Sequence, residues 1–134
     1  MMSKGPITGT FIDEITYDIP CSNWSYDQWG KDLDYMQEIG IDTVIFVRGG
    51  FGERTIYPSK AFGIEGVDDF AGFILKETAK RGMKVIFGLY ISGINWNDGD
   101  AEGEIRKNKL FVDEVWRRYG EYPSFAGWYI PHEV

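Results

Sequence analysis

The chain has 134 residues, of which 43% are apolar and 26% charged, with a formal net charge of −7 and a pI near 4.7. This composition is ordinary for one globular domain and excludes a disordered or collagen-like chain. The negative charge argues against a nucleic-acid partner, because the protein as a whole repels a phosphate backbone.

The first strand and the first helix are predicted from the side-chain pattern near the N-terminus. Residues 7–12 are rich in β-branched and aromatic side chains, which predicts a strand that ends at Asp13 and Glu14. After a loop, Ser25 and Gln28 have the spacing of a helix capping box, and apolar residues then recur at helical spacing. A first helix is therefore expected to begin at this serine.

Two further strands are predicted with a helix between them. Residues 43–48 are apolar at consecutive positions, as expected for a strand covered on both faces of a parallel sheet, and this strand ends at Arg48. The glycine-rich loop that follows leads to a helix that we expect Asp68 to cap and that ends near residues 81–82. Residues 84–91 are the third predicted strand.

The last third of the chain repeats this pattern. Residues 93–104 have the composition of a loop, a longer amphipathic helix follows, and residues 124–131 are a fourth strand that ends at His132 and Glu133. The order is β-α-β-α-β-α-β, and each connection is long enough to join parallel neighbours. The predicted fold class is therefore α/β, with one domain over residues 1–134.

Two architectures are compatible with this order, and the glycine pattern separates them. An open sheet that binds a dinucleotide needs G-x-G-x-x-G between its first strand and helix, but residues 13–24 contain no glycine. In a (β/α) barrel the chemistry lies on the loops after the strands, where solvation alone also explains single charged residues. Here the strand ends carry Asp13, Glu14, Arg48, Tyr90, Ser92, His132 and Glu133.

Four segments of the chain resemble a known family. "TGTFIDE", "GIDTVIFVRGGFGERTIYPS", "GMKVIFGLYIS" and "FAGWYIPHE" resemble the N-terminal half of a bacterial family of uncharacterised TIM-barrel domains grouped with the glycoside hydrolases. More loosely, the chain is similar to the retaining glycosidases whose fourth strand ends in Asn-Glu. The resemblance implies the first four βα units of an eight-unit barrel, with Glu133 as general acid/base. It places His132 where those enzymes have a sugar-binding asparagine, and Arg48 where an arginine supports the nucleophile.

Cleavage of a glycosidic bond requires a carboxylic acid that protonates the leaving oxygen, and in retaining enzymes a second carboxylate about 5–5.5 Å away. We expect desolvation by the preceding apolar strand to raise the pKa of Glu133 toward neutrality. Trp96 is explained equally well by sugar stacking and by a small hydrophobic cluster under the loops. The candidate substrate-binding residues are His132, Arg48, Asp13, Glu14, Tyr90, Trp96 and Trp128.

The expected partners are a carbohydrate substrate and either the missing C-terminal half of the barrel or a second copy of the chain, because a half-barrel leaves strand edges unpaired. The chain is therefore expected to be a fragment that is inactive alone. Two competing hypotheses remain: a non-catalytic carbohydrate-binding barrel, and a phosphosugar-binding or nucleotide-binding enzyme that uses "RGGFG".

No cofactor and no metal site are expected. His132 is the only histidine, and "PHEV" lacks the second histidine of H-E-x-x-H. Cys21 is the only cysteine, which excludes an internal disulfide and a thiolate cluster. Without a signal-peptide core or a membrane-spanning apolar run, the chain as given is expected to be cytoplasmic, although a longer parent protein could be exported.

Overall fold

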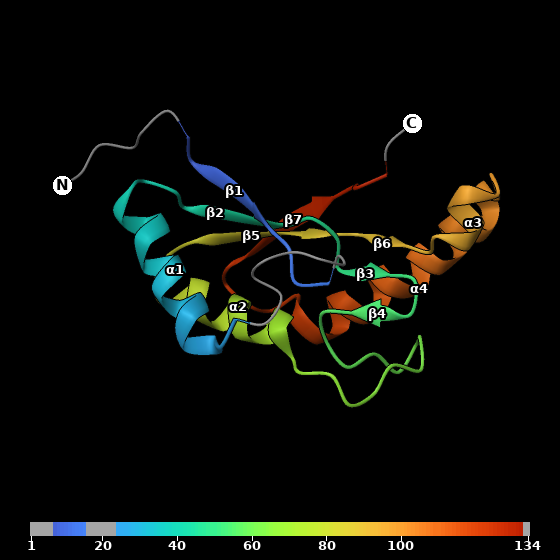
Figure 1. Cartoon of the computed structure of the whole chain (residues 1–134), viewed down its shortest axis with the longest axis horizontal. Helices are drawn as coiled ribbons and strands as arrows, with labels where there is room; N and C mark the ends of the chain where they lie inside the picture. The colour runs from blue at the N-terminus through green and yellow to red at the C-terminus, as the bar shows by residue number, and fades with distance from the viewer. Residues whose placement is uncertain (1–6, 16–23, 133–134) are drawn as a thin grey trace.

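The structure is a computed structural model that describes residues 7–15 and 24–132. Helices lie on one side of a parallel sheet with strand order β1-β2-β5-β7 (Figure 1). These strands are β1 (Gly9–Ile12), β2 (Thr43–Phe46), β5 (Lys84–Gly88) and β7 (Phe125–Tyr129). The main helices are α1 (Tyr26–Glu38), α2 (Phe70–Lys80) and α4 (Ala101–Tyr119). The predicted α/β class with a parallel sheet is confirmed, and each strand is shorter than predicted.

The helix starts follow local capping chemistry. Ser25 Oγ accepts a hydrogen bond from the Gln28 backbone N–H at 3.2 Å, and the Gln28 side chain accepts one from the Ser25 N–H at 2.8 Å, so the predicted capping box is confirmed. The cap predicted for the second helix was wrong by one residue. Asp69, not Asp68, accepts the hydrogen bond from the Gly72 N–H at 2.9 Å. Asp68 and Asp69 are adjacent and chemically equivalent, so the sequence alone does not indicate which of them caps the helix.

The structure contains a second sheet of three short strands. Two of these strands lie in the segment predicted to be the glycine-rich loop, and the third is the end of the strand predicted over residues 84–91. Its order is β4-β3-β6, with β3 at Gly50–Phe51, β4 at Arg54–Thr55 and β6 at Tyr90–Ile91. The third predicted strand breaks at Leu89, whose N–H donates to the Tyr129 carbonyl at 3.0 Å. Beyond this point the chain pairs with β3 instead of continuing the large sheet.

The predicted loop over residues 93–104 is also corrected. It contains the short helix α3 (Ile94–Asn97) and the first turn of α4, which begins after Asp100. The Asp100 carboxylate accepts a hydrogen bond from the Gly103 N–H at 2.9 Å, and this caps the helix. The glycines and aspartates of this stretch are typical of turns, which conceals the helix start.

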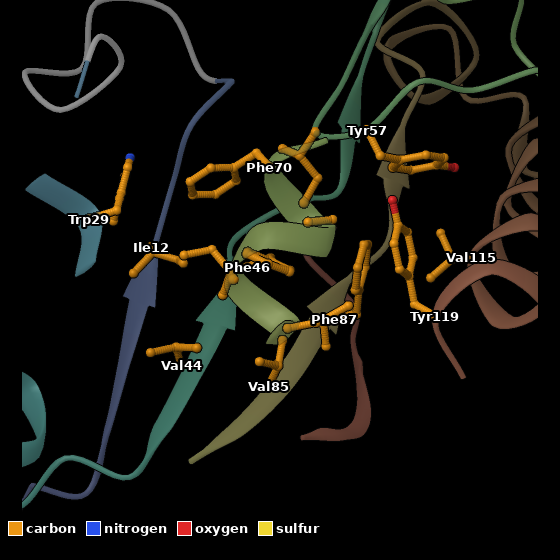
Figure 2. Packing of buried hydrophobic residues seen from close by; sticks show 14 of the residues in the cluster. Ile12, Trp29, Val44, Phe46, Tyr57, Phe70, Val85, Phe87, Val115 and Tyr119 are labelled. Carbon is orange, nitrogen blue, oxygen red and sulfur yellow. The ribbon is translucent and has the colours of Figure 1, made fainter. Parts of the chain in front are cut away.

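The core lies between the sheet and its helices. Val44 and Phe46 of β2 and Val85 and Phe87 of β5 point to the helix side and are at most 1% exposed. Figure 2 shows these strand side chains beside residues from the helices, among them Phe70. Burying each such side chain contributes roughly 1.5–3 kcal/mol, so this layer fixes which face of the sheet the helices cover.

The opposite face of the sheet is open among the described residues and is curved. Ile45 and Ile86 are only partly buried there, and Phe11 is 51% exposed. Phe11 lies on one edge strand and Tyr129 on the other, yet their ring centroids are 5.2 Å apart. Because the outer strands of a flat four-stranded sheet lie roughly 14 Å apart, this contact indicates a sheet that curves toward the face without helices. In the described ranges, the helices are all too short or too polar to cross a bilayer.

Candidate functional site

The carboxyl ends of the four parallel strands share one edge of the sheet (Figure 1). Two groups of polar side chains lie after these ends. The first group is the histidine cluster, which consists of Ser92, Trp96, Glu104 and His132. The second is the Glu14 cavity, which lies after β1 and beside β4. The two groups are built from different connections.

A buried carboxylate holds the histidine cluster together. Glu104, in the first turn of α4, is 4% exposed and accepts hydrogen bonds from the Ser92 N–H at 3.0 Å and from the Ser92 hydroxyl. Its Oε1 lies 2.8 Å from His132 Nε2. Trp96 of α3 packs against the imidazole at a centroid distance of 4.8 Å and an angle of 70°. Three separate segments therefore converge on the residue that precedes Glu133.

Glu104 is charged at neutral pH. Burial raises the pKa of Glu104, but the hydrogen bonds from Ser92 and His132 outweigh burial and leave the pKa below its usual value. A carboxylate at this position favours the tautomer with a proton on His132 Nε2, which leaves Nδ1 as the ring nitrogen for another partner. The arrangement can therefore orient the imidazole for hydrogen bonding.

Glu104 was missed by sequence reasoning, because it falls in the stretch predicted to be a loop. Only the recognition of Asp100 as a helix cap would have placed this glutamate on a helix, four residues beyond the cap and on the turn that faces the strand ends. No short motif marks the pairing of Glu104 with His132, which are 28 residues apart.

The Glu14 cavity has a volume of about 590 Å³. Burial raises the pKa of Glu14 to about 7; the Trp29 indole and Arg54 oppose this rise, whereas Asp13 adds to it. Glu14 Oε2 is buried and makes no hydrogen bond to the rest of the described chain. The carboxyl group therefore exchanges a proton near neutrality. Other residues around the cavity include Trp24, Tyr26, Glu53, Asp68 and Phe70.

Two other predicted residues lie near the second sheet. The Arg48 guanidinium is 5.3 Å from the centre of the Phe51 ring. The Tyr90 side chain is 4% exposed, and its hydroxyl donates to the Gly52 carbonyl at 2.5 Å, which holds the β3-β4 turn. The Tyr90 backbone is held in turn by Asn108 of α4, through hydrogen bonds of 2.9 and 2.8 Å. These contacts give Tyr90 a structural role in the described part of the protein.

The remaining predicted residues separate into different environments. Trp128 packs on the helix side of the sheet against Phe87 and Phe125, at centroid distances of 6.1 and 5.2 Å. Asp13 accepts a hydrogen bond from the Ile15 N–H at 3.1 Å. Glu133 lies outside the described residues, so its predicted role stays a prediction. The structure thus brings His132 together with Trp96, and places Glu14 in the cavity.

The glycine-rich segment after β2 forms a hairpin and does not lead into a helix. A Cβ atom on Gly50 would collide with the Tyr90 ring, and one on Gly49 would lie 2.5 Å from the Phe111 ring. Close packing therefore accounts for these glycines without a bound phosphate. Among the described residues, no group of three or more histidine, cysteine, aspartate or glutamate side chains is placed to hold a metal ion.

The family described as "Domain of unknown function (DUF4434)" matches residues 7–134. The chain belongs to this family. A crystal structure described as that of a "putative alpha-L-fucosidase" from Bacteroides thetaiotaomicron is 45% identical to the chain and superposes with a TM-score of 0.85. The match covers 93% of this chain and 40% of the neighbour, so the chain spans less than half the length of that protein. No curated protein matches the chain.

Proposed function

We propose that this chain is part of a glycoside hydrolase, in which it supplies the first four βα units of a TIM barrel. The observation that carries the proposal is the 45% identity and TM-score of 0.85 with the structure described as that of a "putative alpha-L-fucosidase". The histidine cluster and the Glu14 cavity add sugar-compatible groups after the strand ends, where barrel enzymes hold their active sites. The proposed substrate class is an α-L-fucoside within an oligosaccharide or polysaccharide.

In the proposed mechanism, Glu133 is the general acid/base of a double displacement. It would protonate the leaving oxygen and then, as a carboxylate, deprotonate the water that releases the sugar. His132, oriented by Glu104, would hydrogen-bond a sugar hydroxyl through Nδ1. The Glu104 contact also restrains the backbone immediately before Glu133, and such positioning is a large part of enzymatic rate enhancement. The nucleophile would come from outside this chain.

The curvature of the sheet supports the half-barrel part of the proposal. Phe11 and Tyr129 approach each other across the open face, and Phe11 is 51% exposed there. In a closed barrel, side chains of the remaining strands fill this interior in layers. The neighbour has more than twice the matched length, which is enough chain to supply those strands. We therefore propose that the 134 residues alone do not turn over substrate.

The test is hydrolysis of 4-nitrophenyl α-L-fucoside and release of reducing sugar from fucosylated oligosaccharides. We expect no turnover by the 134-residue chain, and turnover by a longer protein that carries this chain together with the rest of the barrel. In that protein, Glu133→Gln is expected to reduce kcat by about 10²–10⁴-fold, the usual contribution of general acid–base catalysis. Activity of the short chain, or full activity of the glutamine variant, would end the assignment of this role.

A non-catalytic carbohydrate-binding barrel is the second candidate. The cavity lined by Glu14, Arg54 and Trp24 favours it, because these polar and aromatic side chains do not depend on Glu133. This candidate predicts fucoside binding by the longer protein without turnover, and with the same affinity in the Glu133→Gln variant.

A further inference from the structure

We propose that the Glu14 cavity is a binding site for a neutral 6-deoxyhexose ring, separate from the histidine cluster. The inference rests on the proposed carbohydrate function, but it requires neither hydrolysis nor Glu133. The cavity, of about 590 Å³, falls within the range of small-molecule sites, roughly 300–1,000 Å³. It is lined by Glu14 and Ile15 after β1, by the start of α1, by the strand β4 and by the residues that precede α2.

The polar side of the cavity suits vicinal hydroxyl groups. Glu14 and Arg54 lie close enough for the guanidinium to affect the pKa of the carboxyl group. Glu14 is partly exposed and lines the cavity, so its side chain borders the space that a sugar ring would occupy. Because its pKa is raised to about 7, Glu14 can also present an O–H group at neutral pH.

The aromatic and apolar sides of the cavity suit a sugar ring and its methyl group. Trp24 and Tyr26 line the cavity and are 37% and 41% exposed, so flat apolar surface faces outward. Ile15, Ile56 and Phe70 also line it and are at most 4% exposed, and they form an apolar floor. A pocket with a few directed polar groups on an apolar wall is the usual form of a small-molecule site. A methyl substituent can pack on this floor without burying a polar group, whereas a hydroxymethyl group would also bury its hydroxyl.

The charge of the cavity selects against acidic sugars. The carboxyl groups of Glu53 and Asp68, joined by that of Glu14 when it is ionised, share the lining with the guanidinium of Arg54. The chain as a whole carries −7. A uronate would therefore meet a negative potential, whereas a neutral ring does not.

The experiment measures sugar binding to the 134-residue chain by saturation-transfer NMR and calorimetry, with L-fucose as the probe. We expect a Kd of about 1–10 mM. L-Galactose, which differs from L-fucose by one hydroxyl on C6, is expected to bind about threefold more weakly than L-fucose. D-Glucuronate is expected to bind more weakly still. Equal or tighter binding of either sugar would overturn the proposed selectivity, and no L-fucose binding up to about 100 mM would overturn the site itself.

Two matched pairs of variants locate the bound sugar. Tyr26→Ala is expected to weaken L-fucose binding about tenfold, whereas Tyr35→Ala, a 65% exposed tyrosine on the same helix, leaves it unchanged. Arg54→Gln is expected to weaken binding similarly, and Arg117→Gln on α4 to have no effect. The arginine pair decides the question if Tyr26→Ala fails to fold, because Tyr26 also stacks on Phe73. Binding unaffected by Arg54→Gln would overturn the proposal.

The binding measurement tests the cavity assignment, and the turnover measurement tests the proposed hydrolase, so each can fail without the other. If L-fucose binds and the Arg54→Gln variant loses it, while the longer protein hydrolyses no fucoside, the cavity assignment stands and the proposed hydrolase falls. If the longer protein is active but neither cavity variant changes L-fucose binding, only the cavity assignment falls.

Discussion

Removal of the Glu104 carboxylate is the sharpest test of the histidine cluster. Glu104→Ala deletes the acceptor of three hydrogen bonds, two from Ser92 and one shared with His132, in a position that is 4% exposed. A hydrogen bond to a charged group contributes about 1.5–3 kcal/mol, and removing this shared carboxylate leaves the hydrogen-bonding groups of Ser92 and His132 buried without their acceptor. We therefore expect the free energy of unfolding to fall by about 3–5 kcal/mol at pH 7.

The assay is urea unfolding followed by circular dichroism, with two comparison variants. Glu104→Gln keeps the shape and one acceptor, and is expected to cost about 1–2 kcal/mol. Glu102→Ala removes an exposed glutamate from the same helical turn and is expected to cost under about 1 kcal/mol.

The pH dependence follows from the lowered pKa of Glu104. A carboxyl whose pKa is lower in the folded state stabilises the fold above its unfolded pKa, and this stabilisation is lost as the pH falls through the folded value. The difference between wild type and Glu104→Ala should therefore be largest above about pH 4.5 and shrink on acidification. The reasoning would be refuted if Glu104→Ala lowered the free energy of unfolding by less than about 1 kcal/mol at pH 7. It would also be refuted if the stability difference between wild type and this variant grew in acid.

Three further predictions concern the cavity, a helix cap and the sheet. The pKa of Glu14 is raised from 4.5 to about 7, so the free energy of unfolding falls as the pH rises between these values. In thermal unfolding, Glu14→Gln should be more stable than wild type by about 1–2 kcal/mol at pH 8, a value discounted for the partial exposure of this group. Near pH 4 the two proteins should be equally stable. Ser25→Ala should lower the free energy of unfolding, measured in urea, by about 0.5–2 kcal/mol. An unchanged free energy would contradict the observed capping box. Gly88→Ala should lower the free energy of unfolding by more than about 3 kcal/mol, because the new Cβ would collide with the β2 backbone beside the Phe46 carbonyl. Gly30→Ala, in an open position of α1, should be neutral or stabilising by up to about 1 kcal/mol. Equal effects at the two sites would contradict this packing.

Periodic and capping patterns made much of the fold predictable from sequence. The box at Ser25 and the consecutive apolar residues of β2 and β5 each mark an element through neighbours in the sequence. The β3-β4 hairpin and α3 were not predicted, because their stability comes from contacts distant in sequence. Tyr90, for example, holds the hairpin turn through the Gly52 carbonyl, 38 residues earlier.

The candidate site was predictable only in part, for a related reason. Strand ends place Glu14 and His132 at the correct edge of the sheet, but sequence position does not reveal what surrounds them. The partner of His132 is a glutamate in another connection, and the cavity beside Glu14 depends on Arg54 of the unpredicted hairpin. Trp128, predicted to bind substrate, packs on the helix side of the sheet. A β-bulge in the pairing of β5 and β7, between Val85 and Ile86, shifts the simple alternation of side chains there.

The small sheet β4-β3-β6 links the two polar groups mechanically. Arg54, which borders the cavity, lies on β4, and Ser92, which binds Glu104, is the next residue after β6. The strand between them is bonded to both. We therefore expect a ligand that shifts the hairpin to shift the segment that carries Ser92 as well, and a change in the NMR signals of the His132 ring on addition of L-fucose would test this.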